Sequence, residues 1–127
     1  MNIMKAIKIF GVLFILGVLS SCEYNFITPD TGAPVDPDET VSFSEQIEPI
    51  WSTQGCTSCH PSTAGLDLRV GYAYQSLQSE SRINTENPTE SLILTMPGSS
   101  GVHSDKDYVS NQRELIKVWI QQGAQDN

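Results

Sequence analysis

Cys56-Thr57-Ser58-Cys59-His60 is the stretch that dominates the chemistry of this chain of 127 residues. It places two thiols three positions apart, about one helical turn, and puts an imidazole directly after the second thiol. Two thiols at this spacing can add to two vinyl groups on one edge of a single flat ligand. The adjacent imidazole can then bind a metal ion at the centre of that ligand. The motif therefore joins covalent attachment and metal ligation.

This spacing is typical of c-type haem attachment, but two other kinds of site use a cysteine pair. A thioredoxin-like disulfide is expected beside a strand-helix-strand pattern, which the turn-forming residues 62–65 do not supply. A zinc site needs four ligands, and the only other histidine is His103. We therefore expect one covalently bound haem c, tethered by Cys56 and Cys59, with His60 as the proximal axial ligand.

The distal axial ligand has two candidates. Met96 is the preferred one, because it precedes Pro97, is the only methionine outside the first 21 residues, and offers a thioether, which raises the potential of a haem. His103 lies in the same loop, and an imidazole ligand would instead lower the potential. With either ligand, both axial positions of the iron are filled.

Residues 1–21 are typical of a bacterial lipoprotein signal peptide. Lys5 and Lys8 give a positive start, and the apolar run over residues 9–19 is shorter than the about 20 residues of a membrane-spanning helix. Leu19-Ser20-Ser21-Cys22 resembles the lipobox, and the resemblance implies cleavage before Cys22 and lipidation of its sulfur. The alternative is an ordinary secretory signal followed by a chance cysteine.

The three cysteines are then all assigned, one to lipid and two to haem, and no thiol is left over in an oxidising compartment. Both modifications take place outside the cytoplasm. Bacterial lipoproteins with an aspartate after the lipidated cysteine tend to stay in the inner membrane, and this chain has Glu23. We expect a cell-envelope protein anchored by lipid, favouring the outer membrane on its periplasmic or surface face.

Residues 22–40 contain prolines and acidic residues and little to bury, which predicts a flexible, disordered linker behind the lipidated N-terminus. Residues 41–127 show no internal repeat and are expected to form one small domain. A domain of this size buries little apolar surface, so a cofactor would contribute part of the core.

Two helices are predicted at the ends of this domain. Ser42 and Glu45 fit a capping box, and Pro49 should kink or end the first turns that follow. Asn111 and Glu114 fit a second capping box. The helix after it has an apolar face and should end in a left-handed cap at a glycine; these residues are Leu115, Ile116, Trp119, Ile120 and Gly123.

Residues 41–127 resemble a small monohaem cytochrome c domain of bacterial exported lipoproteins, of the class I-like or planctomycete-type cytochrome c group. Besides the cysteine motif, the matching features are Ile47-Glu48-Pro49-Ile50-Trp51, Gly65-Leu66-Asp67-Leu68, Met96-Pro97, and Trp119-Ile120 before Gly123-Ala124. The resemblance implies an all-α fold in which the first and last helices cross beside the haem. It also implies that His60 is the proximal ligand and that the later loop supplies a sulfur ligand.

The net charge of the chain limits the classes of molecule that are expected to bind it. Removal of Lys5 and Lys8 with the signal peptide leaves five basic and fifteen acidic residues, a net charge of −10. Nucleic acid would repel such a chain, and the charge favours a redox partner with a basic docking face. The equal alternative is an acidic surface that only keeps the protein soluble. The expected function is one-electron transfer. The alternative is a haem sensor or a structural accessory domain of an envelope complex, whereas an enzyme is not expected without a distal acid-base group.

Overall fold

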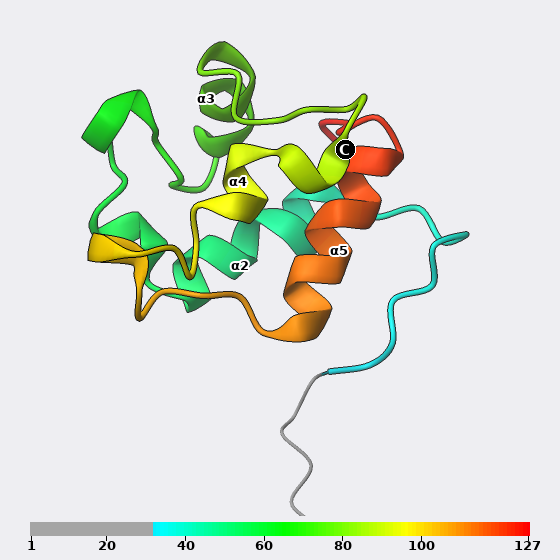
Figure 1. Cartoon of the computed structure of the whole chain (residues 1–127). Coiled ribbons are helices and arrows are strands. Elements are labelled where there is room, and N and C mark those ends of the chain that lie inside the picture. The colour runs from blue at the N-terminus through cyan, green and yellow to red at the C-terminus, as the bar shows by residue number, and fades with distance from the viewer. Residues whose placement is uncertain (1–31) are drawn as a thin grey trace, which may run out of the picture.

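The computed structural model describes residues 32–127, and the regular structure in this range is entirely helical. The α-helices are α2 (Glu48–Thr53), α3 (Ala73–Ser79), α4 (Leu92–Thr95) and α5 (Ser110–Gln121) (Figure 1). Shorter turns are the π-helix η1 (Phe43–Ile47) and the 3-10 helices η2 (Cys56–Ser58), η3 (Thr63–Gly65), η4 (Pro88–Glu90) and η5 (Gly101–His103). The predicted all-α class is confirmed for these residues. The predicted signal peptide and Cys22 lie outside them.

The first helical segment begins at Ser42, as predicted, but its capping box differs from the prediction. The Ser42 hydroxyl oxygen accepts a hydrogen bond from the Glu45 backbone N–H at 3.3 Å. In the second bond of the capping box, the Ser42 N–H donates to the Gln46 Oε1 at 2.8 Å, and not to Glu45. The reason is that η1 is a π-helix, whose wider turn brings the next residue back over the cap. Pro49 follows in the first turn of α2, where its missing N–H breaks no helical bond.

The last helix, α5, also begins at a different residue from the one predicted. Its N-cap is Val109, so Asn111 lies inside the first turn, and the Gln112 Oε1 accepts from the Val109 N–H at 3.3 Å. The chain reaches this point in an extended conformation because Tyr108 is buried just before it. Tertiary packing therefore sets the start of α5, and the predicted cap at Asn111 is wrong.

The predicted end of α5 is confirmed. Gly123 has a φ of +96°, a left-handed conformation that glycine adopts without steric cost. The N–H of Gly123 donates to the Ile120 carbonyl at 3.0 Å, and the N–H of Ala124 donates to the Trp119 carbonyl at 3.0 Å. This pair of bonds is the Schellman motif, which satisfies carbonyls at a helix end.

Aromatic side chains join the first and last helices. The Phe43 ring lies at the centre, with its centroid 5.9 Å from Trp51, 5.1 Å from Trp119 and 5.3 Å from Tyr74. Both tryptophans are almost completely buried. Asn127 adds a hydrogen bond to this cluster, because its Oδ1 accepts from the Phe43 N–H at 2.8 Å. The region where η1 and α2 meet α5 is therefore the core of the domain (Figure 1).

The boundary of the domain lies close to residue 41. Val41 is buried, and its N–H donates to the Gln122 Oε1 at 2.9 Å. The side-chain amide of Gln122 also donates from its Nε2 to the carbonyls of Pro37 and Glu39, at 3.2 and 2.8 Å. The last residues of the expected linker therefore lie against the end of α5. None of the helices within residues 32–127 is long and apolar enough to cross a membrane.

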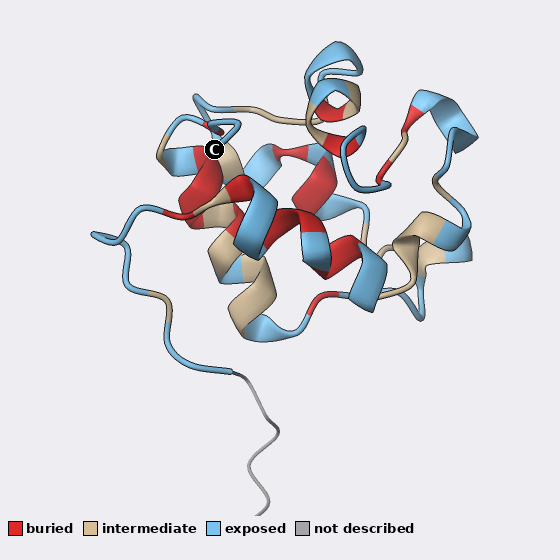
Figure 2. Cartoon of the chain, turned by 180° about the vertical axis from the view of Figure 1, so that it is seen from behind, coloured by how far each residue is buried: buried red, intermediate tan, exposed pale blue. Residues whose placement is uncertain are grey.

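Burial is unevenly distributed over the domain. Buried residues are concentrated on α2 and α5, whereas none of residues 55–65 is buried (Figure 2). Residues 55–65 include η2, η3 and the cysteine motif. The aromatic core thus lies at one side of the molecule. The cysteine motif lies in a part of the chain where the residues are less buried.

Candidate functional site

A glycine turn leads from α2 into the cysteine motif. Gly55 has a φ of +72°, and it reverses the chain between Gln54 and η2. The carbonyl of Cys56 then accepts from the N–H of Cys59 at 3.1 Å and from the N–H of His60 at 3.0 Å. These bonds hold both thiols and the imidazole on one tight turn, as the spacing in the sequence predicted.

The motif lines a cavity of about 310 Å³ with mainly apolar walls. Cys56, Cys59 and His60 belong to one wall, and both predicted distal candidates, Met96 and His103, belong to the same cavity. Its volume lies at the lower end of the range for small-molecule and cofactor sites, about 300–1,000 Å³. The structure therefore brings together all five candidate haem residues that fall within the described range.

The rim of the cavity is unusually apolar for a surface. Leu92, Met96 and Val102 all line the cavity and are 39%, 42% and 86% exposed. They are half of the six large apolar side chains that are exposed in residues 32–127. Apolar residues gathered at one concave place on a surface are typical of a site that binds a ligand or a partner. Leu66 and Leu68 are buried and also line the cavity.

His60 is held in a geometry that suits a metal ligand. Its Nδ1 lies 3.2 Å from the carbonyl oxygen of Thr63. In the tautomer whose Nδ1–H donates to this carbonyl, the Nε2 carries a lone pair. A backbone carbonyl that fixes the other ring nitrogen in this way is a regular companion of metal-binding histidines.

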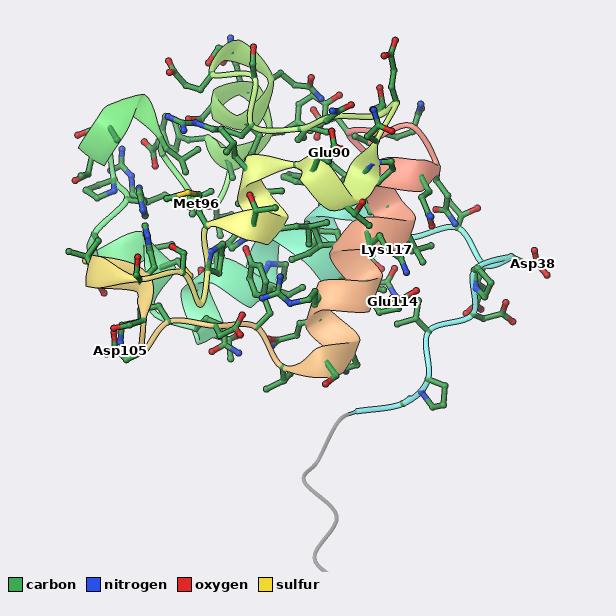
Figure 3. The ribbon with its side chains drawn as sticks, viewed as in Figure 1. Asp38, Glu90, Met96, Asp105, Glu114 and Lys117 are labelled. Carbon is green, nitrogen blue, oxygen red and sulfur yellow. The ribbon has the colours of Figure 1, made fainter. Side chains whose placement is uncertain are left out.

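His103 lies near His60 in the lining of the same cavity. The two imidazole rings are parallel to within 6°, and their centroids are 6.1 Å apart. Met96 lies at the end of α4, on the same side of the molecule as η2, η3 and η5 (Figure 3). Both distal candidates thus line the same cavity as the proximal side chain, and the ring of His103 is parallel to the ring of His60.

The thiols differ in their surroundings, and neither forms a disulfide in this structure. Cys59 is exposed, whereas Cys56 is partly buried, and this burial raises the pKa of the Cys56 thiol above its ordinary value. In the described part of the chain, no group of three or more His, Cys, Asp or Glu residues is placed to hold a metal ion.

Two cationic side chains, Arg82 and Lys106, also line the cavity. The Arg82 Nη2 donates to the Ala64 carbonyl at 2.9 Å, whereas its Nε is buried and has no hydrogen-bond partner among the described residues. Buried donors without a partner are rare in proteins. The sequence analysis did not identify Arg82, because residues 78–90 carry no local pattern that marks one residue.

Comparison of the chain with protein families, with curated proteins and with solved structures found no match. The site is therefore interpreted from its own residues.

Proposed function

We propose that this protein is an exported, lipid-anchored, monohaem c-type cytochrome that carries one electron at a time. The observation that supports this most directly is the common cavity of Cys56, Cys59 and His60, with Met96 and His103 also in its lining. When bound there, a haem c supplies an iron ion that alternates between the ferric and ferrous states. The remaining roles belong to the side chains of the chain itself.

Three residues of the motif would hold the cofactor. Cys56 and Cys59 are the tethers, since each thiol forms one thioether, and His60 is the proximal ligand. The Thr63 carbonyl orients the imidazole through the Nδ1, so that the Nε2 is the nitrogen that binds iron. Met96 and His103 are the two side chains able to fill the opposite axial position, and a filled position leaves no site for a substrate on the metal.

The charges in the cavity wall fit the acidic groups of a haem. Arg82 and Lys106 line the cavity in a chain whose mature form carries a net charge of −10. Each is also paired with a carboxylate, Arg82 with Glu80 at 3.9 Å and Lys106 with Asp105 at 3.6 Å. The guanidinium of Arg82 and the ammonium of Lys106 are groups with which haem carboxylates would pair. The apolar rim at Leu92 and Val102 would in turn lie against the apolar part of the ring.

The acidic surface and the predicted lipid suggest where the electron goes. A protein with this charge attracts a redox partner with a basic docking face, and it repels nucleic acid. Lipid on Cys22 would keep the domain close to the membrane, and residues 22–40 would let it reach a neighbouring complex. One-electron transfer between envelope proteins agrees with both properties.

The test is maturation of the full chain in a bacterium that attaches haem c, followed by mass spectrometry and absorption spectroscopy of the denatured protein. We expect the mass of one haem that resists extraction. The variant with both Cys56→Ala and Cys59→Ala should lose it, whereas Thr57→Ala with Ser58→Ala should keep it. A wild-type chain without covalent haem, beside a known cytochrome matured in the same cells, would overturn the proposal. Rapid binding of carbon monoxide by the ferrous protein would favour a haem sensor instead.

A further inference from the structure

His103 is positioned opposite His60 by its backbone. Its carbonyl oxygen accepts from the N–H of Gly98 at 3.1 Å and from the N–H of Lys106 at 3.0 Å. Gly98 also donates to the Lys106 carbonyl at 2.9 Å, which closes the loop around η5. This network fixes the place from which the imidazole reaches the cavity.

The separation of the two rings matches a shared metal ion. A bond between a metal and an imidazole nitrogen is about 2 Å long. If one nitrogen of each ring turns toward the ion, two such bonds and the distances from the nitrogens to their ring centres span a gap close to the 6.1 Å between the centroids of His60 and His103. Direct contact of the rings is the competing explanation, since offset aromatic pairs have centroids about 4.5–7 Å apart.

The side chain of Met96 is less constrained in its orientation than that of His103. It follows the single turn of α4, its side chain is 42% exposed, and a methionine has three rotatable side-chain bonds. Such a side chain adapts to a wall of irregular shape and does not require one orientation. Met96 lines the cavity, and the ring of His103, which lines it too, lies parallel to the ring of His60.

We propose that His103 is the distal axial ligand, so that the iron is held between two imidazoles and Met96 is an apolar wall residue. This inference rests on the proposed haem attachment and changes the ligand that the sequence favoured. It makes the protein a low-potential carrier, because an imidazole in place of a thioether ligand lowers the potential of a haem. Its partners are then donors and acceptors of correspondingly low potential.

The experiment uses the full, matured protein in its ferric state. Absorption and near-infrared magnetic circular dichroism should show a low-spin iron without the sulfur-to-iron charge-transfer band. Met96→Leu should leave the spectrum and the potential unchanged. His103→Leu should lose the original low-spin spectrum, either as a high-spin iron or through capture of Met96, which would make the sulfur band appear and raise the potential.

A sulfur band in the wild type that disappears in Met96→Leu would overturn the inference, as would a high-spin wild-type iron, which would leave the two rings as a simple aromatic pair. Should His103→Leu fail to mature, the wild type and Met96→Leu still decide between the ligands. Absence of covalent haem would overturn haem attachment itself. A haem-loaded protein with methionine ligation would overturn only the role of His103.

Discussion

The indole Nε1–H of Trp51 donates to the hydroxyl oxygen of Tyr108 at 3.0 Å, in the interior of the domain. Trp51 is completely buried in the aromatic core, whereas Tyr108 is buried and also lines the cavity. The bond therefore connects α2, just before the cysteine motif, with the segment that leads into α5. This hydrogen bond joins a core residue to a residue of the cavity lining. A substitution in the core should therefore also affect the cavity lining, and the reverse.

Replacement of Tyr108 by phenylalanine should destabilise the protein. The Trp51 N–H would remain buried without an acceptor, which costs about 1–3 kcal/mol in the free energy of unfolding. Denaturant unfolding followed by tryptophan fluorescence measures this difference. The matched control is Tyr72→Phe, because Tyr72 is 59% exposed, and we expect a change within about 0.5 kcal/mol there. Equal effects of the two variants would contradict the importance of the buried bond.

Stability should also fall at alkaline pH because of Tyr108. Burial raises the pKa of its hydroxyl well above the ordinary value, mainly by excluding water from the charged form. In the unfolded chain the group loses its proton near about pH 10, while the folded protein retains it. Unfolding then releases a proton, so this contribution to stability is present below about pH 10 and is lost as the pH rises further.

Comparison of three proteins isolates this effect. The free energy of unfolding measured against pH should fall less steeply above about pH 10 in Tyr108→Phe than in the wild type. Tyr72→Phe should follow the wild-type slope. Identical slopes in all three proteins would show that Tyr108 ionises in the folded state as readily as in the unfolded chain.

Removal of the positive charge at Arg82 should lower the potential of the matured protein. A cation in the cavity wall disfavours the ferric state, which carries one more positive charge than the ferrous state. Arg82→Gln should therefore lower the potential, as a redox titration would measure. Arg69→Gln is the control, because Arg69 lies outside the cavity lining, is 52% exposed and pairs with Asp67 at 2.7 Å. An equal shift in both variants would rule out a specific role for Arg82.

Loss of the predicted lipid should release the protein from the membrane. Cys22 lies outside the described residues, and its lipidation stays a prediction from the sequence. Cys22→Ala removes the acyl attachment point, and the acidic linker offers no affinity for anionic lipid in its place. Membrane fractionation should find this variant in the soluble fraction, whereas Ser21→Ala, which keeps a small residue before the cysteine, should stay in the pellet. A pelleting Cys22→Ala variant would disprove the anchor.

The sequence by itself determined the features whose physical causes are local. The turn of Cys56 and His60 follows from their spacing, and the Schellman end of α5 follows from a glycine at Gly123. The apolar face of α5 follows from helical periodicity. Each of these depends on interactions among residues a few positions apart, and the sequence displays such relations directly.

Only the tertiary structure decided the start of the last helix and the composition of the cavity. The start of α5 moved to Val109 because Tyr108 is buried in the core, which a local capping pattern at Asn111 does not register. Arg82 and His103 meet His60 at one cavity because packing of the aromatic core brings distant segments together. Proximity of that kind is set by how the whole chain buries its apolar surface, and no spacing along the sequence encodes it.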